Sequence, residues 1–314
     1  MVFSVCELQP QQSSSRECQS FKLDSSDKSN DASNFIVMSW NIEGLDRNSY
    51  NLENFINSYK PSLVFLSEPQ VFSCDVARIM TLFDDNYKYS LNSEGKHDLD
   101  IPMDRIRAKG GTLAMWCSDI DQYVTALPTS SAAVLPLMVK LPGLAPACHI
   151  GVYLPTAGLE EQFMALSELD NTIASVLEKF GEETIVFIRG DMNISSKNSS
   201  RSPLLLHIMS KHNLTRVQTL HPSYHHFMGA VGEFDSDLDV ILHTSRKDVQ
   251  EMFSEQVCKN AHPLIESHHD LLISRVFLPP VETPVLAPVP LAPKVPNNRA
   301  NKKGFFDVKL QPLL

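Results

Sequence analysis

Polar residues of the kinds that bind hard metal ions recur just past the ends of strand-like apolar runs. Asn41 follows IVMSW, Glu68 follows LVFLS, Asp191 and Asn193 follow IVFIRG, and His269 precedes LLISRVF. If these runs are strands of one sandwich, their ends share a rim and the side chains meet there. Hard divalent cations select carboxylate and amide oxygens, and a phosphodiester needs its negative charge neutralised while water attacks it. The residue types therefore favour metal-dependent phosphodiester hydrolysis.

Each of these residues has a simpler explanation when it is taken alone. A glutamate after an apolar strand is most often a solvated charge in a loop. Gly-Asp-x-Asn favours a turn as readily as a site, because glycine, aspartate and asparagine all suit turns. The hypothesis of a site therefore depends on the elements around these residues and on the order of the motifs.

Strand-like apolar runs and helical patterns alternate along the chain and supply the elements that must position these side chains. Helical periodicity covers 51–59 and 159–180, and a third helix is predicted to begin after Ser202, with Pro203 at its first position. Many short strands with a few covering helices predict a two-sheet α/β sandwich, and no internal repeat is evident. The predicted strands are 35–40, 63–67, 112–116, 134–141, 148–154, 184–189, 238–243 and 271–277.

The composition of the two ends differs from that of the middle. Residues 1–33 are rich in Ser, Gln, Asp and Lys and lack apolar periodicity, which predicts a disordered N-terminal tail. From residue 279 onward prolines recur every second or third position, which predicts a linker, with residues 279–314 as proline-rich linker and C-terminal tail. The folded domain is expected over 34–278.

The overall composition excludes several classes of protein. A net charge of −10 over 314 residues argues against a broad basic surface, so any binding of DNA should be transient and through a local cleft. Six cysteines without a close CxxC pair argue against a zinc cage or a disulfide framework. Neither an apolar run of about 20 residues nor a secretory signal is present, which predicts no membrane span and an intracellular location, nuclear or cytoplasmic.

Six motifs occur in the chain in the order WNIEGL, LSEPQ, VYLPTAG, RGDMN, SDLDVIL and SHHDLLI. In this order they resemble the endonuclease/exonuclease/phosphatase superfamily over about residues 34–278. GGTLAMW, HPSYHHF and SDLDVIL are most similar to the endonuclease domain of non-LTR retrotransposons, with abasic-site endonucleases as more distant relatives. The resemblance implies a four-layered, DNase I-like α/β sandwich, an active site at one edge, and Mg²⁺-dependent hydrolysis of a phosphodiester that leaves a 3′ hydroxyl.

The resemblance also implies a role for each matched residue. Glu68 would be the main metal ligand, with Asn41 beside it holding metal or water. Asp191 would position and activate the attacking water, and Asn193 would orient either the phosphate or Asp191.

Three further residues would act on the phosphate. Tyr153 would contact the scissile phosphate. His269 would hydrogen-bond a phosphate oxygen and stabilise its charge, with Asp239 fixing the tautomer of the imidazole.

The chain departs from the family pattern at a few positions. The last motif usually reads Ser-Asp-His, and here His268 takes the place of the aspartate next to the metal. Imidazole prefers softer metals, so weaker Mg²⁺ binding is expected, and Mn²⁺ becomes an alternative. Asp270 could supply the missing carboxylate only if its loop bulged. Thr156 stands where abasic-site enzymes have asparagine and could still bind phosphate through its hydroxyl.

Three functions remain open from the sequence. The first is an active, Mg²⁺- or Mn²⁺-dependent endonuclease that nicks DNA. The second is a retrotransposon-derived remnant in which His268 impairs hydrolysis and which acts at most as a binding protein. The third is a phosphatase or phosphodiesterase for a small or lipid substrate, which the acidic charge suits but the retrotransposon-like motifs do not.

Overall fold

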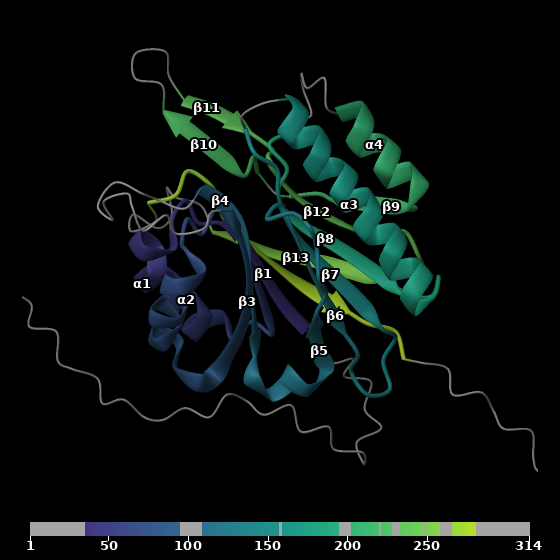
Figure 1. Cartoon of the computed structure of the whole chain (residues 1–314), viewed down its shortest axis with the longest axis horizontal. Coiled ribbons are helices and arrows are strands. Elements are labelled where there is room, and N and C mark those ends of the chain that lie inside the picture. Colours follow the sequence, from purple (N-terminus) through teal and green to yellow (C-terminus); the bar gives the residue numbers. More distant parts are fainter. Residues whose placement is uncertain are drawn as a thin grey trace, which may run out of the picture. The chain divides into compact units, whose positions relative to one another are not determined.

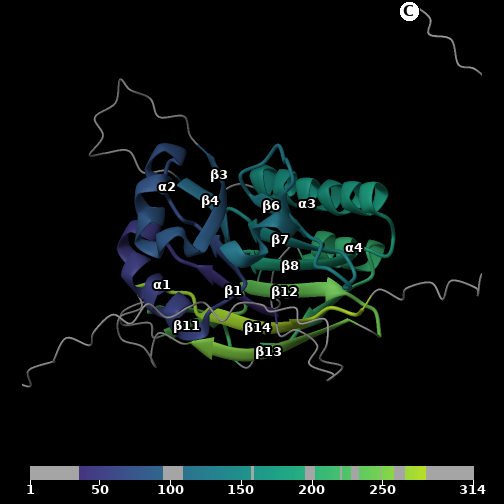
Figure 2. The same cartoon turned by 90° about the horizontal axis from the view of Figure 1, so that it is seen from below.

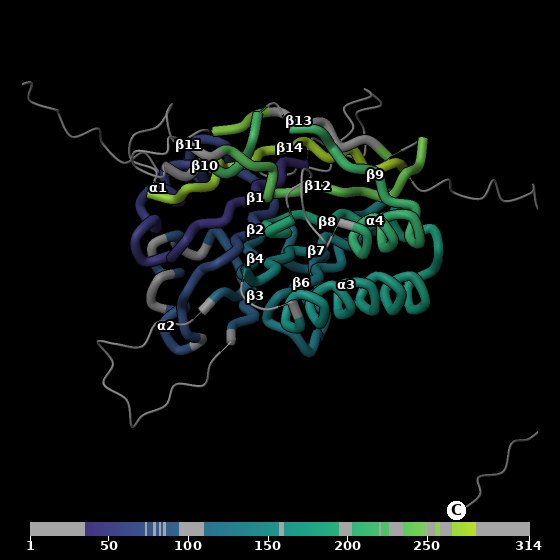
Figure 3. The backbone as a smooth tube through the Cα atoms, turned by 90° about the horizontal axis from the view of Figure 1, so that it is seen from above, coloured from purple at the N-terminus to yellow at the C-terminus, as the bar shows by residue number. Residues whose placement is uncertain are grey.

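Two mixed six-stranded sheets face each other in the fold, which is known from a computed structural model (Figure 1). In order across the first sheet, the strands are β13 (Gln250–Val257), β14 (Leu271–Phe277), β1 (Phe35–Asn41), β2 (Leu63–Ser67), β4 (Lys109–Cys117) and β3 (Tyr87–Glu94). In order across the second sheet, they are β5 (Val124–Ala126), β6 (Val134–Val139), β7 (Ala147–Tyr153), β8 (Ile185–Asp191), β12 (Asp239–Thr244) and β9 (Leu214–Val217). The tube in Figure 3 follows β1, β2, β4 and β3 side by side, with β12, β8, β7 and β6 alongside them.

Helices and a small hairpin complete the fold. The helices are α1 (Leu45–Tyr59), α2 (Ser73–Met80), α3 (Leu159–Phe180) and α4 (Ser202–Lys211), and the short 3₁₀ helices are η1 (Thr81–Asn86) and η2 (Ser118–Tyr123). The antiparallel strands β10 (Tyr224–Phe227) and β11 (Glu233–Ser236) form a hairpin at one end of the sheets (Figure 1).

The structure describes residues 35–94, 109–156, 159–194, 202–219, 221–227, 233–247, 249–257 and 266–280. All of these residues fall within one compact unit, residues 1–281. The predicted tail at 1–33 and residues 281–314 of the predicted linker and tail lie outside the described residues. No helix in the described part of the chain is long and apolar enough to cross a membrane.

Three apolar cores separate four layers. Trp40 of β1 and Phe55 of α1 belong to the core between the first sheet and helices α1 and α2. Phe65 of β2 and Phe187 of β8 belong to the core between the two sheets. Leu169 of α3 packs in the core between the second sheet and helices α3 and α4. The predicted four-layered α/β sandwich is therefore confirmed, and Figure 2 shows the helix pairs on opposite sides.

Strand β1 is apolar almost without a break because both of its faces are covered. Phe35 and Val37 face the core between the sheets, whereas Met38 and Trp40 face the core beneath α1 and α2. Successive side chains of a strand point to opposite faces, and a strand covered on both faces must be apolar on both.

Each of the eight predicted strands is a strand in the structure, and the predicted helix at 159–180 matches α3. The sequence reasoning missed β3, β5, β9, β10, β11, β13 and α2, and it began α1 six residues late, at 51 instead of Leu45. The missed strands of the two sheets all lie at sheet edges. An edge strand has only one paired neighbour and tolerates polar residues, so it lacks the long apolar run of an inner strand.

Lys60 ends α1 in the left-handed conformation, with φ 46° and ψ 56°. A side chain with a Cβ is strained there, whereas glycine is not. We expect Lys60→Gly to raise the free energy of unfolding by about 1 kcal/mol, as measured by urea denaturation. Lys60→Ala keeps the Cβ and serves as the control; an equal gain from alanine would show that the backbone conformation is not the cause.

Candidate active site

The predicted site residues converge at one rim, where strands of both sheets end or begin. Asn41 is the last residue of β1 and Asp191 the last of β8. Asp239, the first residue of β12, pairs in register with Asp191, and Tyr153 pairs with Asp191 from the other side. His269 lies two residues before β14 begins. Parallel β7 and β8, with antiparallel β12 beside them, bring these ends together.

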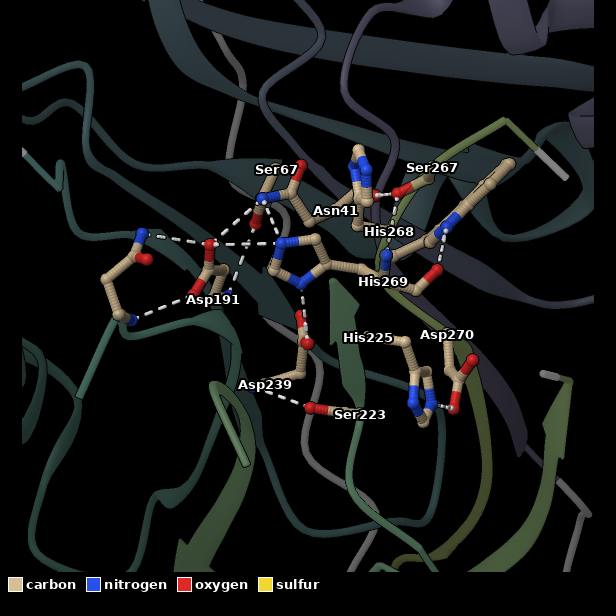
Figure 4. Close-up of polar contacts among 12 residues, drawn as sticks. Asn41, Ser67, Asp191, Ser223, His225, Asp239, Ser267, His268, His269 and Asp270 are labelled. Carbon is tan, nitrogen blue, oxygen red and sulfur yellow. Dashed lines mark hydrogen bonds and ion pairs between the residues drawn. The ribbon is translucent and has the colours of Figure 1, made fainter. Parts of the chain in front are cut away.

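Asn41 lies at the centre of the cluster and is fully buried. Its Nδ2 lies 2.9 Å from Asp191 Oδ2, 3.4 Å from Glu68 Oε1 and 3.3 Å from His269 Nε2 (Figure 4). Its Oδ1 accepts the backbone N–H of Glu43 at 3.1 Å, which fixes the orientation of the amide. An amide nitrogen donates hydrogen bonds and cannot ligate a cation. The contacts therefore direct the amide nitrogen of Asn41 toward the carboxylates of Asp191 and Glu68, and the metal or water role predicted for Asn41 stays a prediction.

Asp191 is held by three donors. Asn41 Nδ2 and Asn193 Nδ2 each donate to Oδ2 at 2.9 Å, and the backbone N–H of Asn193 donates to Oδ1 at 2.8 Å. Asn193 is itself fixed, because its Nδ2 also donates to the carbonyl of Leu154 at 2.7 Å. Of the two roles that the sequence left open for Asn193, these contacts match the orientation of Asp191.

His269 is directed toward Asp191 by contacts at both its ring and its backbone. Its Nδ1 lies 2.8 Å from Asp239 Oδ2, and its Nε2 lies 3.9 Å from Asp191 Oδ2. Trp40 Nε1 donates to the His269 carbonyl at 3.1 Å, and the His269 N–H donates to Ser267 Oγ at 3.0 Å. The ring thus joins two buried carboxylates, as Figure 4 shows.

The charges in this cluster shift the pKa values of Asp191 and His269. Burial raises the pKa of Asp191 to about 7, with Asp239 adding to the rise and His269 opposing it. Burial on its own lowers the pKa of His269, but the charge and hydrogen bond of Asp239, together with Asp191 and Glu43, outweigh burial and raise it to about 9. At neutral pH the imidazole is therefore a cation, and the Asp191 carboxyl lies close to its midpoint.

Glu68 follows β2 at the rim and is partly exposed. Its Oε2 accepts Gln70 Nε2 at 3.1 Å. Among the described residues no group of three His, Cys, Asp or Glu side chains is arranged to hold a metal ion. Mg²⁺ commonly has one or two protein carboxylates and completes its shell with water and substrate phosphate. Glu68 therefore fits such an ion on the chemistry of its oxygens.

His268 has a partner that the sequence reasoning did not foresee. Its Nδ1 lies 2.9 Å from Oε2 and 3.2 Å from Oε1 of Glu43, whose Oε2 also accepts the His268 backbone N–H at 2.8 Å. Both side chains are partly exposed, at 38% and 27%. Glu43 therefore engages the Nδ1 nitrogen of His268, and the metal role predicted for His268 stays a prediction.

Asp270 does not replace the missing carboxylate at the metal position. Its side chain is fully buried and contacts His225 and Gln256 instead. The bulged loop that would have turned Asp270 toward the metal position is thus not what the structure shows.

Tyr153 and Thr156 lie at the end of β7 and beyond it. The Tyr153 ring fills the space next to Gly110, where an added Cβ would come within 2.7 Å of ring atom Cε1. The close approach explains Gly110, the first glycine of the GGTLAMW motif, whereas at Gly111 an added Cβ would lie 2.9 Å from the Asn92 carbonyl oxygen. Thr156 is exposed.

Left-handed backbone conformations concentrate at the rim. Among the described non-glycine residues, six have positive φ, and four of them belong to the site: Glu43, Glu68, Gln70 and Asn193. Each such residue costs of the order of 1 kcal/mol and persists only where its surroundings determine it. Strain of this kind often marks functional sites.

Tyr224 and Glu43 are the site residues that sequence reasoning missed. The Tyr224 ring lies 4.8 Å from the His269 ring in an edge-to-face contact. Burial raises the pKa of its phenol, and the charges of Glu43, Asp191 and Glu68 raise it further. Glu43 lies in the motif WNIEGL, and an acidic residue two positions after Asn41 was the sequence signal that could have identified it. Nothing in the local sequence pattern of Tyr224 indicated its contact.

The chain has a DNase I-like fold, which it shares with several solved structures. The endonuclease domain of TRAS1, a telomere-specific non-LTR retrotransposon, superposes with a TM-score of 0.57 at 15% identity, over 77% of this chain and 98% of that chain. AP endonuclease LMAP from Leishmania major gives 0.56 at 15% identity, over 78% and 88%.

TDP2 from D. rerio, complexed with a single-strand DNA product, gives a TM-score of 0.53 at 15% identity, over 78% of this chain and 99% of that chain. No sequence-family model and no curated protein matches the chain. At these identities the likeness establishes the fold, and the chemistry depends on the residues at the rim.

The pairing of His269 with Asp239 predicts a pH dependence of stability. A histidine of the unfolded chain titrates near 6.5 and the folded His269 near 9, so the folded protein holds one more proton between these values. The stabilisation is present below pH 6.5 and is lost as the pH rises through 9. In Asp239→Asn we expect the pKa of His269 to fall, in imidazole NMR titrations, and the loss of stability above pH 6.5 to become shallower.

Asp170→Asn is the control for this experiment. Asp170 also pairs with a histidine, His212, at 2.6 Å, but it lies on α3, which contributes no residue to the rim. If Asp170→Asn moved the His269 titration as far as Asp239→Asn does, or if Asp239→Asn left it unchanged, the attribution to Asp239 would be wrong.

Proposed function

We propose that the chain is a metal-dependent phosphodiesterase that nicks DNA, an endonuclease of the retrotransposon type. The observation that carries the proposal is the buried chain of contacts from Asn41 through Asp191 and His269 to Asp239. It sets a carboxylate and an imidazolium 3.9 Å apart at the rim. A base and a cationic donor at that spacing suit hydrolysis of a phosphodiester by water.

The charge states assign the roles of the two groups. His269 is cationic at neutral pH, so it donates a hydrogen bond to a phosphate oxygen and stabilises the charge that develops there. Asp191 has a pKa near the working pH, which suits a general base, and it accepts the proton of the attacking water. Asn193 and Asn41 hold the carboxylate in place during this transfer.

Glu68 is the residue that would hold the cation, and a bound Mg²⁺ or Mn²⁺ ion would neutralise the phosphate and polarise it toward attack. Tyr153 and Thr156 would contact the phosphate backbone. A DNA substrate is supported by three proteins of the same fold: a retrotransposon endonuclease domain, an AP endonuclease and a TDP2 bound to a DNA product.

A second candidate function has a specific observation in its favour. The contact between His268 and Glu43 places an imidazole where the family pattern has an aspartate. The loss of that aspartate removes a carboxylate from the metal site and favours a remnant that binds nucleic acid without cutting it. The first experiment must therefore distinguish an active enzyme from a disabled relative.

The experiment is nicking of supercoiled plasmid by the purified protein, first with Mg²⁺ and then with Mn²⁺. We expect the natural chain to nick. Asp191→Asn should slow nicking by about 100-fold to 10,000-fold, because the general base is lost. Glu68→Gln should also slow it, and more added metal should partly restore the rate. Asp170→Asn, a carboxylate change on α3, should leave the rate unchanged.

The reversion His268→Asp decides between the two functions. If only His268→Asp cuts, the natural chain is a disabled relative and the remnant hypothesis takes over. If neither the natural chain nor His268→Asp cuts with either metal, the nuclease proposal is wrong.

The two shifted pKa values predict a bell-shaped dependence of kcat/KM on pH. Activity should rise through about pH 7 as Asp191 ionises and fall through about pH 9 as His269 loses its proton. Asp239→Asn should move the alkaline limb to lower pH, because the imidazolium loses its main counter-charge. A profile without an alkaline limb, or one that Asp239→Asn leaves in place, would contradict the role of His269 as a cationic donor.

A further inference from the structure

The β10–β11 hairpin is attached to the segment that carries His269 by contacts that the proposed mechanism does not use. Tyr224 forms an isolated antiparallel bridge with His269. The backbone N–H of His225 donates to the His268 carbonyl at 2.9 Å, and the N–H of Asp270 donates to the Ser223 carbonyl at 2.8 Å. The two segments therefore run side by side over residues 223–225 and 268–270.

A buried carboxylate reinforces this attachment. Asp270 is fully buried, and its Oδ2 lies 3.2 Å from His225 Nε2 and 2.7 Å from Gln256 Nε2. The other ring nitrogen of His225, Nδ1, lies 2.7 Å from Oδ1 of Asp235 on β11. An imidazole between two carboxylates satisfies both only when both nitrogens donate. His225 thus connects both strands of the hairpin to Asp270, as Figure 4 shows for the His225 and Asp270 pair.

Gln256 links the residues that precede the hairpin to the same carboxylate. Its Nε2 also donates to the carbonyls of His221 and Pro222, each at 3.1 Å, and its Oε1 accepts the His221 N–H at 3.2 Å. A buried carboxyl group without hydrogen-bond donors is strongly destabilising, so the contacts determine one position for the segment.

The hairpin segment contacts the proposed site through Tyr224 and Ser223. The Tyr224 ring packs edge-to-face on His269 at 4.8 Å, and Ser223 Oγ accepts the backbone N–H of Asp239 at 3.0 Å. The hairpin segment therefore touches both members of the Asp239 and His269 pair. Whatever fixes residues 223–225 also fixes the ring that would bind the phosphate.

We propose that Asp270 is a positioning residue, which acts through His225 to hold Tyr224 against His269. The effect on catalysis rests on the proposed function. The positioning of His269 can be detected without hydrolysis. It also gives a role to the His225 of the HPSYHHF motif, both of whose ring nitrogens face carboxylates rather than a metal.

The test compares Asp270→Asn, His225→Ala and His225→Gln in the full chain by two readouts. The first is the low-field imidazole N–H resonance of His269, which its hydrogen bond to Asp239 protects from exchange. The second is kcat and KM for plasmid nicking. We expect Asp270→Asn and His225→Ala to broaden the resonance and to lower kcat about 10-fold with little change in KM. His225→Gln should restore most of both, because its amide can still donate to Asp270.

Tyr224 and Asp170 supply the matched variants. Tyr224→Ala removes the ring that contacts His269 and should behave like Asp270→Asn. The double variant Asp270→Asn with His225→Ala should be no worse than either single change, since both break one connection. Asp170→Asn, with a histidine partner on a different element, should change neither readout.

Several outcomes would overturn the proposal. A sharp resonance and an unchanged kcat in Asp270→Asn and His225→Ala would do so, as would an equal loss in Asp170→Asn, which would indicate general loosening. If the resonance is lost but kcat is unchanged, the catalytic part of the proposal is wrong. If the natural chain does not cut DNA, the proposed function fails, but the resonance still decides whether Asp270 positions His269.

Discussion

The hydrogen bond from Asn41 to Asp191 joins the two sheets at the rim, and the rest of the site depends on it. Asn41 ends a strand of the first sheet and Asp191 ends a strand of the second, 150 positions later in the chain. A second cross-sheet contact lies just behind, where Ser67 Oγ donates to the Val152 carbonyl at 3.0 Å. Because the interior of the sandwich is close-packed, the two strand ends cannot shift relative to each other without disturbing these bonds.

Glycine makes this close approach possible. Gly190 adopts φ 135°, and a Cβ there would lie 2.0 Å from the Val152 carbonyl oxygen and 3.1 Å from Ser67 Oγ. Any larger residue would push apart the strands that carry Asp191 and Tyr153. The RGDMN motif therefore combines a backbone requirement at Gly190 with a chemical one at Asp191, which is why a turn alone does not account for it.

Buried charge is the second constraint on the site. His269 is nearly inaccessible to solvent, and its cation is tolerated because Asp239 and Asp191 lie on either side. A charge removed from water in this way is stable only when it is paired and hydrogen-bonded. The same principle applies on a smaller scale to Asp270, which is buried and held by His225 and Gln256. His268 differs, since its pair with Glu43 is partly exposed and open to competition from solvent or a cation.

The sequence by itself determined the inner strands, the α3 helix and the fold class, because residues such as Val37 and Trp40 are apolar on both faces of a covered strand, and that pattern is local. It also determined the chemical types at the rim, Glu68, Asp191 and His269 among them, because each follows or precedes such a strand. Only the tertiary structure decided which groups meet. It turned the Asn41 amide nitrogen toward Asp191, paired His268 with Glu43, and placed Asp270 with His225 and Tyr224 against His269. These contacts join segments up to 225 positions apart, and their geometry depends on sheet packing and left-handed backbone turns that no local pattern encodes.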